Sequence, residues 1–421
     1  MIKQWIARYR TIFGIAGILL LLASSFSYAM FQGGFVSWFL LYSVVPLVVY
    51  TFFIVAFRLT AISVERHVQK DHFIAGDTME VTISLHSKVP LPLLFLVVQD
   101  ELPTSFMKQA KEYGDYYQSE TRALLFPLFK RDISYKYIVK PVPRGVYQFN
   151  SISLETGDLF GFISKKIHIP KTKTIQVFPK TQMISGWNIF ETHPSGMKRA
   201  GKQAQQDFTS AVSIRDYTPG DKLSWLNWKA SARSNKLITK VFETQRNDDF
   251  VVFLDGSHPG YQRNGEDTFE RAVSLCASIL KHSVSKGTSV EFHTVAKDHT
   301  EFSFHSGQDF ESKVMYHLAR IQPNTRTALT SILKKEVHEM SRGVSVLIIS
   351  PDLSDAFVHT LERMAGNQVK TMLFYLPKKQ QLSKEEKQLL TRLRSREIVV
   401  YPVLYDDFNE IIKAGVTNAS G

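Results

Sequence analysis

The chain has 421 residues and is too long for one ordinary domain, so we expect two or three. Its hydrophobic content of 44% is that of a globular protein and excludes a low-complexity chain, and its net charge is +12. The single cysteine, Cys276, excludes an internal disulfide. It lies on the apolar side of a helical pattern, so we expect a buried, unreactive thiol.

Residues 1–60 predict a membrane hairpin. Residues 11–57 contain no charged side chain, which is enough for two passes because one helical span needs about 20 apolar residues. We divide them into Thr11–Met30 and Phe35–Phe57, joined by a turn at residues 32–34. Positive residues flank the spans on both sides: Lys3, Arg8, Arg10, Arg58, Arg66 and Lys70. This pattern predicts a two-pass inner-membrane protein, in contact with the lipid bilayer through residues 11–57, with both termini in the cytoplasm.

A cleaved signal peptide is the alternative interpretation of the first span, with Ser27-Tyr28-Ala29 as a weak cleavage site. A second uncharged span follows almost at once, which disfavours this alternative. Even after cleavage, Arg58 and Arg66 would favour keeping the following chain in the cytoplasm.

Residues 61–185 predict an antiparallel β-sandwich of the immunoglobulin-like kind. Apolar and polar residues alternate around Met79, Val81, Ile83 and Leu85, and the same period of two recurs at residues 133–139. Proline and glycine turn signals separate these runs, and short strands at such spacing are typical of a sandwich. The region contains no cluster of catalytic residue types, so we interpret it as a spacer or docking module.

Residues 186–246 form a basic and aromatic connecting segment. Between Gly196 and Arg246 there are ten Lys/Arg against four Asp/Glu, a net charge of +6. Trp225 and Trp228 are three residues apart, which would place both rings on one side of a helical turn. We favour a structural interpretation, in which arginine stems cover the tryptophan rings and the segment is a rigid clasp between the flanking domains. Two alternatives stay open: binding of single-stranded nucleic acid, which we do not expect, and contact with anionic lipid.

Part of this segment resembles a known family. The residues that carry the resemblance, by their order and spacing, are Arg215, Tyr217, Gly220, Asp221, Trp228, Ser231, Ala232 and Arg233. They resemble the bacterial membrane-anchored family known as domain of unknown function 58. Ser224 departs from the pattern, because that family usually has an arginine there. We expect these residues to shape the connecting segment or to take part in an interaction.

Residues 247–421 predict an α/β domain with a doubly wound, mostly parallel sheet. Phe250–Leu254 is an uninterrupted apolar run, as expected for a strand buried on both faces. Ser383 and Glu386 predict a capping box at the start of the last helix before the final strand. The other expected elements are helices at Thr268–Ser283 and Phe310–Ile321, and strands at Val290–Val295, Val344–Ile349, Val369–Tyr375 and Ile398–Leu404.

The strand Phe250–Leu254 is followed by Asp255-Gly-Ser257-His-Pro259, which resembles the Asp-x-Ser-x-Ser opening of von Willebrand factor type A domains. The resemblance implies a divalent cation held by oxygen ligands, and Mg²⁺ suits that chemistry. Thr327, or else Thr325, and Asp352 stand where the family completes the site. Pro259 replaces the second serine and offers no side-chain oxygen. We therefore expect no cofactor and favour a turn at the strand end, with Mg²⁺ at an incomplete site as the alternative.

The sequence predicts a binding protein rather than an enzyme, because the common nucleotide, zinc-protease and serine-hydrolase motifs do not occur in it. The family resemblance implies a membrane-anchored adaptor that works with a MoxR-type AAA+ ATPase in chaperone-like or assembly tasks. Asp255, Ser257, Thr327 and Asp352 would then form a contact or metal face. A metal-dependent enzyme that uses the Asp255 site is one alternative, and a basic lipid- or nucleic-acid-binding module is another.

Overall fold

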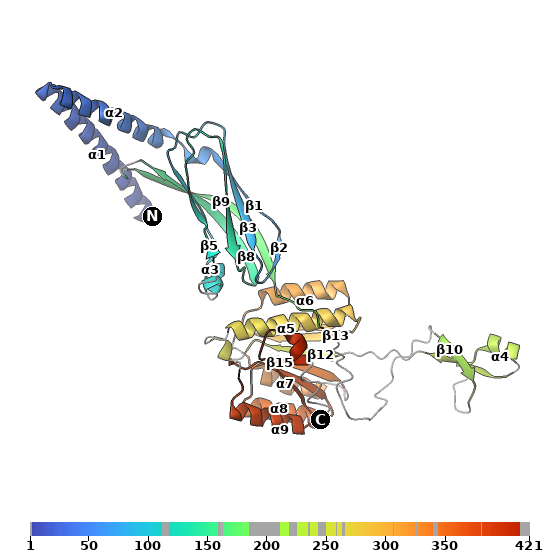
Figure 1. The fold of residues 1–421 in the computed structure, drawn as a ribbon. Coiled ribbons are helices and arrows are strands. Elements are labelled where there is room, and N and C mark those ends of the chain that lie inside the picture. The colour runs from blue at the N-terminus through green and yellow to red at the C-terminus, as the bar shows by residue number, and fades with distance from the viewer. Residues whose placement is uncertain are drawn as a thin grey trace. The chain divides into compact units, whose positions relative to one another are not determined.

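The computed structural model describes residues 2–412, except 112–117, 159–160, 162, 185–210, 219–224, 235, 243–249, 258, 263–265, 306, 325–326, 340–343 and 380. The chain divides into two compact units, Met1–Phe178 and Pro179–Gly421. Figure 1 shows the helices and strands of both units.

The first unit begins with two long apolar helices, α1 (Ile2–Gln32) and α2 (Phe35–Ala56). The helices are separated at Gly33, whose positive φ of 61° favours glycine because a side chain would be strained there. Phe13–Gln32 and Phe35–Ala56 are each long and apolar enough to cross a membrane. The predicted helices and turn are therefore confirmed, although α1 begins well before Thr11.

Two sheets follow in the same unit, with strand orders β1-β3-β7-β5 and β2-β9-β8-β4-β6. The strands of the first sheet are β1 (Ile62–Val68), β3 (Met79–Ser87), β5 (Gln118–Ser119) and β7 (Asp132–Lys140). Those of the second sheet are β2 (His72–Ile74), β4 (Leu96–Asp100), β6 (Arg122–Leu125), β8 (Gly145–Gly157) and β9 (Ser164–Phe178). Neighbouring strands are antiparallel except for β2 and β9, which are parallel.

Both sheets contribute side chains to one apolar core. The residues that predicted the period of two, Met79, Val81, Ile83 and Leu85, are each at most 1% exposed, so the alternation is confirmed. One element was not predicted: α3 (Thr104–Lys111) follows β4. Its Phe106 is buried and packs edge-on against Tyr147, with ring centroids 4.7 Å apart. A helix of eight residues with so few apolar side chains does not stand out among strands.

A buried ion pair connects the two sheets. Arg66 on β1 donates from Nε to Asp100 Oδ2 on β4 at 2.9 Å, and Tyr137 on β7 donates to the same oxygen at 2.7 Å. Arg66 also donates to the carbonyl of Lys171 on β9 at 2.6 Å, and its guanidinium lies over the ring of Phe149. Burial and the Asp100 charge raise the pKa of Tyr137, so it stays a neutral donor. Arg66, which we had counted among the basic residues flanking the membrane, is buried in this network.

The second unit contains a mixed six-stranded sheet with the order β14-β13-β12-β15-β16-β17. The strands are β12 (Phe250–Asp255), β13 (Val290–Val295), β14 (His299–His305), β15 (Ser345–Ser350), β16 (Lys370–Tyr375) and β17 (Val399–Pro402). Its helices are α5 (Glu266–Ser285), α6 (Gln308–Arg320), α7 (Leu329–Glu339), α8 (Asp355–Gly366) and α9 (Lys384–Ser395). All neighbouring strands run parallel except β13 and β14.

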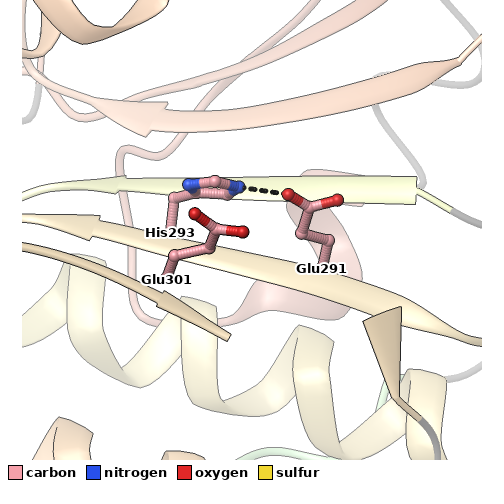
Figure 2. Close-up of side chains that lie close together, drawn as sticks. All are labelled: Glu291, His293 and Glu301. Atoms are coloured by element: carbon pink, nitrogen blue, oxygen red, sulfur yellow. Dashed lines mark hydrogen bonds and ion pairs between the residues drawn. The ribbon is translucent and has the colours of Figure 1, made fainter. Parts of the chain in front are cut away.

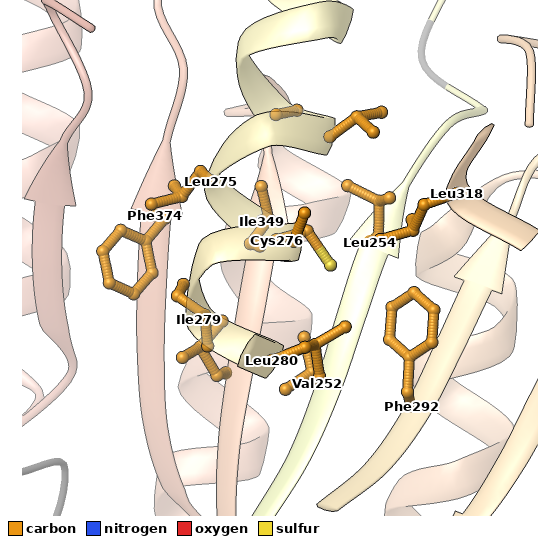
Figure 3. Close-up of a cluster of buried hydrophobic side chains, with 14 of the residues drawn as sticks. Val252, Leu254, Leu275, Cys276, Ile279, Leu280, Phe292, Leu318, Ile349 and Phe374 are labelled. Atoms are coloured by element: carbon orange, nitrogen blue, oxygen red, sulfur yellow. The ribbon is translucent and has the colours of Figure 1, made fainter. Parts of the chain in front are cut away.

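Helices cover both faces of this sheet (Figure 1). Val252 and Leu254 of β12 face the core formed with α5 and α6, whereas Val251 and Phe253 face the core formed with α7, α8 and α9. This two-sided burial explains the uninterrupted apolar run in the sequence. Figure 3 shows Cys276 of α5 among the side chains of the first core. Burial raises the pKa of its thiol, and the prediction of a buried cysteine is confirmed.

The positions of the expected strands agree with the structure to within about two residues, and the Ser383–Glu386 capping box is confirmed. The expected elements did not include β14, nor the helices α7 and α8. A small element in the connecting segment was also missed. β10 (Ala211–Asp216) pairs with β11 (Ile238–Phe242), and α4 (Trp228–Ser234) lies between them in the chain.

Asp100→Ala is expected to destabilise the first unit by about 3–5 kcal/mol, because it leaves the buried Arg66 charge without its partner. Hydrogen exchange of peptides from β1, β4 and β7 in the full-length protein in detergent would report the loss. Asp132→Ala is the matched control, since that carboxylate is exposed and pairs with an exposed His86. The control should cost less than about 1 kcal/mol. Equal effects of the two substitutions would contradict this account.

Candidate site at the carboxyl edge of the mixed sheet

The candidate site lies where β12 and β15 end side by side. Leu254 pairs with Ile349, so the next residues, Asp255 and Ser350, lie at the carboxyl ends of adjacent parallel strands. From β12 the chain continues into α5 on one face of the sheet, and from β15 it continues into α8 on the other. This is the switch in strand order beyond which α/β sheets bind ligands.

Three side chains form a direct hydrogen-bonded network at this edge. Ser257 donates to Asp255 Oδ1 from its backbone nitrogen at 2.9 Å and from Oγ at 2.7 Å. Ser350 Oγ donates to Asp255 Oδ2 at 2.6 Å. Asp255 is 2% exposed, Ser257 5% and Ser350 0%. Both oxygens of this buried carboxylate therefore accept hydrogen bonds from the protein, which compensates for the loss of water.

The network also holds neighbouring loops. Ser257 Oγ accepts a hydrogen bond from the backbone nitrogen of Leu329, the first residue of α7, at 3.1 Å. The carbonyl of Gly256 accepts from the nitrogen of Asn324 at 2.8 Å. A Cβ atom at Gly256 would lie 3.0 Å from the Cβ of Ala296, so the close approach of these loops favours glycine. The loops after β12, β13 and α6 thus meet at one place.

The two other residues predicted for this site lie next to the network rather than in it. Thr327 is half-buried and lies two residues before Leu329 in the chain. The backbone nitrogen of Asp352 donates to Ser350 Oγ at 3.0 Å. Its carboxylate accepts two hydrogen bonds from Ser354, at 2.8 Å from the nitrogen and 3.1 Å from Oγ. Asp352 therefore supports the turn that precedes α8.

This donor set does not fit Mg²⁺ well, because that ion needs oxygen ligands in a near-octahedral arrangement. Both oxygens of Asp255 and the carboxylate of Asp352 already accept hydrogen bonds from serines. Pro259 lies in the 3-10 helix Pro259–Gln262 and supplies no side-chain oxygen. The geometry therefore favours a hydrogen-bonded network that holds the ends of β12 and β15 together, rather than a bound cation.

Sequence reasoning missed Ser350. A signal was present, because Ser350 ends a buried apolar strand and the carboxyl ends of parallel strands lie at one edge. The missing information was which strand lies beside β12. The order of strands in the chain does not give it, since β15 is the third strand after β12 but its direct neighbour in the sheet.

The predicted motif in the connecting segment is described only in part, since Gly220 and Asp221 lie outside the described residues. Ser231 Oγ donates to the carbonyl of Asn227 and accepts from the nitrogen of Ile238, both at 2.9 Å, so it ties α4 to β11. The nitrogen of Tyr217 donates to the carbonyl of Leu237 at 2.9 Å. These two motif residues hold the small element together.

The other motif residues are on its surface. Arg215 donates to Thr218 Oγ1 at 2.8 Å, and Arg215, Ala232 and Arg233 are exposed. Trp228 is 67% exposed. Our interpretation that arginine stems cover both tryptophan rings is therefore wrong for Trp228. The spacing of three residues between Trp225 and Trp228 does not by itself bury a ring, because burial also requires another surface to pack against.

Comparison with known proteins identifies the family. The family described as "Protein of unknown function DUF58" matches residues 213–400. The uncharacterized protein YeaD of Bacillus subtilis (strain 168) is 31% identical over 385 residues, which cover 91% of this chain and 93% of that protein. The chain belongs to the DUF58 family, as the residues around Trp228 had suggested.

Solved structures are only distantly similar. Proximal thread matrix protein 1 from the mussel byssus has 12% identity and a TM-score of 0.30, and the match covers 40% of this chain and 46% of that one. A native alpha-2-macroglobulin fragment from Escherichia coli has 15% identity and a TM-score of 0.20, with 28% and 24% covered. In both cases the match spans less than half of the solved chain. Similarities this weak carry no argument about function.

Ser350→Ala is expected to destabilise the ends of β12 and β15 by about 1–3 kcal/mol, because it removes a hydrogen-bond donor from the buried Asp255 carboxylate. Hydrogen exchange of peptides from these strands would measure the change. Ser354→Ala serves as the control, since Ser354 is exposed and its hydroxyl donates to the carboxylate of Asp352, outside the Asp255 network. Unchanged protection of β12 and β15 in the Ser350 variant would contradict the proposed role of this hydroxyl.

Proposed function

We propose that this protein is an adaptor anchored in the inner membrane by α1 and α2, with the rest of the chain in the cytoplasm. In this proposal the two sheets of the first unit form an immunoglobulin-like β-sandwich, which acts as a spacer. The mixed sheet of the second unit is a von Willebrand A-like domain and carries the contact face. The observation that carries the proposal is the Asp255–Ser257–Ser350 network, which fixes several loops at the switch point of the sheet.

The contact face consists of the groups around this network that reach solvent. Thr327 is half-buried and Ser354 exposed, and they lie on the loops before α7 and before α8. A shallow pocket of about 320 Å³ lies beyond the end of β13, and its lining includes Lys297, Arg320 and Asn324. Asn324 is bonded to Gly256, so this pocket is continuous with the Asp255 loops. The lining also includes Asp298, so its two basic side chains exceed its one carboxylate, and such a pocket beside fixed loops suits an acidic segment of a protein partner.

The partner we propose is a MoxR-type AAA+ ATPase, as the family resemblance implies. An adaptor of this kind would bring the ATPase or its client to the bilayer. The rigid network supports such a role, because preorganised loops lose little conformational entropy on binding.

A metal-dependent enzyme that uses Asp255 is less well supported. A catalytic carboxylate must reach its substrate or metal, whereas Asp255 is 2% exposed. Its two oxygens accept hydrogen bonds from Ser257 and Ser350. These contacts suit a structural role at the base of a binding face.

A second candidate function, contact with anionic lipid, is favoured by one observation. Trp228 is 67% exposed at the start of α4, and the nearby Lys229, Arg233 and Lys236 are exposed as well. An exposed aromatic ring among basic residues is typical of surfaces that lie on a membrane interface. This candidate is compatible with the adaptor, because it uses different residues.

The topology can be tested by thiol labelling in a Cys276→Ala background. Gly33→Cys should react with a membrane-impermeant thiol reagent added to intact cells, because Gly33 connects the two spans on the outer side. Ser420→Cys should react only after the cells are permeabilised. Labelling of Ser420→Cys in intact cells would show that the C-terminus lies outside and would overturn the adaptor proposal.

The contact face can be tested by photo-crosslinking in native membranes, with and without a slowly hydrolysed ATP analogue. A photoreactive amino acid at Thr327 should capture an AAA+ ATPase when the analogue is present. The matched control is Asn367, which is exposed at the opposite, amino-terminal edge of the sheet, before β16. A third position, Trp228, should yield lipid adducts if the second candidate function is correct.

These positions separate the two proposals. Equal capture at Thr327 and Asn367, or no ATPase at either, would contradict the contact face. Protein adducts without lipid adducts at Trp228 would contradict the lipid proposal. Lipid adducts at Trp228 that vanish at high salt would support it, because contacts with anionic headgroups are screened.

A further inference from the structure

Three side chains on one face of the β13–β14 pair meet outside the Asp255 network. Glu291 and His293 are two residues apart on β13, so they lie on the same face of the strand. Glu301 of β14 is directly opposite His293 in the antiparallel register. Figure 2 shows the Glu301 carboxylate beside the His293 ring, and a dashed line marks the contact between that ring and Glu291. One ligand atom from each residue lies within 4.8 Å of the other two.

The His293 ring is held in place on every side. It is 1% exposed, it stacks on Phe253 with 4.6 Å between ring centroids, and its edge meets the nearly parallel ring of His299 at 5.2 Å. Nε2 of His293 lies 2.7 Å from Glu291 Oε1, and Nδ1 lies 3.0 Å from His299 Nε2. A buried ring fixed by stacking and by its second nitrogen is the arrangement that metal-binding histidines have in proteins.

We propose that Glu291, His293 and Glu301 bind a divalent transition-metal ion such as Zn²⁺. One imidazole nitrogen and two carboxylate oxygens suit Zn²⁺ better than Mg²⁺, which prefers oxygen ligands alone. The two carboxylates also balance the charge of the ion. Glu301 is exposed, so the fourth position is open to water.

The site needs a defined proton arrangement around His293. Nε2 would bind the ion in place of the proton it shares with Glu291, and Nδ1 would donate its proton to Nε2 of His299. Nε2 of His299 accepts this proton when the imidazole is in the tautomer protonated at Nδ1. His299 is therefore a positioning residue that orients the ligand His293.

A simple hydrogen-bonded pair between His293 and Glu291 is the competing explanation of these contacts. That pair would form in the same way without the Glu301 side chain. The two explanations therefore differ in what they predict for Glu301, which lies on the neighbouring strand. Because Glu301 is exposed, its substitution can be made without disturbing the core.

The test is Zn²⁺ titration of full-length, untagged protein in detergent after removal of bound metal, with a chromophoric chelator as competitor. Wild-type protein should bind one equivalent of Zn²⁺. Glu301→Gln protein should bind none, or bind it with at least about tenfold lower affinity, because a ligand is removed. Glu385→Gln is the matched control, an exposed carboxylate on α9 in the same unit. Binding of Co²⁺ in the same place should give visible absorption bands that Glu301→Gln loses.

Two results would overturn the proposal. One is wild-type protein that binds no Zn²⁺ in competition with the chelator. The other is Glu301→Gln protein that binds Zn²⁺ as tightly as wild type, which would show that Glu301 is not a ligand. Thermal unfolding of both variants without metal checks that each is folded, so that a loss of binding reports on the site itself.

Discussion

The burial of β12 on both faces is the constraint on which the second unit depends. All six residues of Phe250–Asp255 are buried, so none of them can place a polar side chain in water. The first polar group, Asp255, comes where the strand ends, and burial there requires donors for both of its oxygens. Ser257 and Ser350 supply them. The polar network at the sheet edge is thus a consequence of how the central strand is covered.

What the sequence predicted well is what depends on local spacing. The apolar run of β12, the period of two in β3 and the capping box at Ser383 are visible within a few residues, and each is confirmed. What it missed depends on pairing between distant segments. Arg66 meets Asp100, and Asp255 meets Ser350, only because of strand order and register. These cannot be read from periodicity.

The histidines show the same limit in another form. His293 and His299 are close in the sequence, and only the strand that contains His293 was expected there. The structure instead places His299 on β14, an antiparallel edge strand, and register then brings Glu301 opposite His293. The sequence around His293 therefore did not reveal that Glu301 lies beside it. The antiparallel register of β13 and β14 sets which side chains are opposite each other.

An edge strand has unpaired backbone groups and needs protection against pairing with other chains. β14 is such a strand, since it is the last in its sheet and, within the described part of the chain, pairs only with β13. An ion bound by Glu291, His293 and Glu301 would cross-link β14 to β13 through side chains, in addition to the backbone ladder. The proposed metal would then stabilise the edge of the same sheet whose centre carries the Asp255 network. The two sites share no residue, so the contact face could be kept intact while occupancy of the metal changes the stability of the edge.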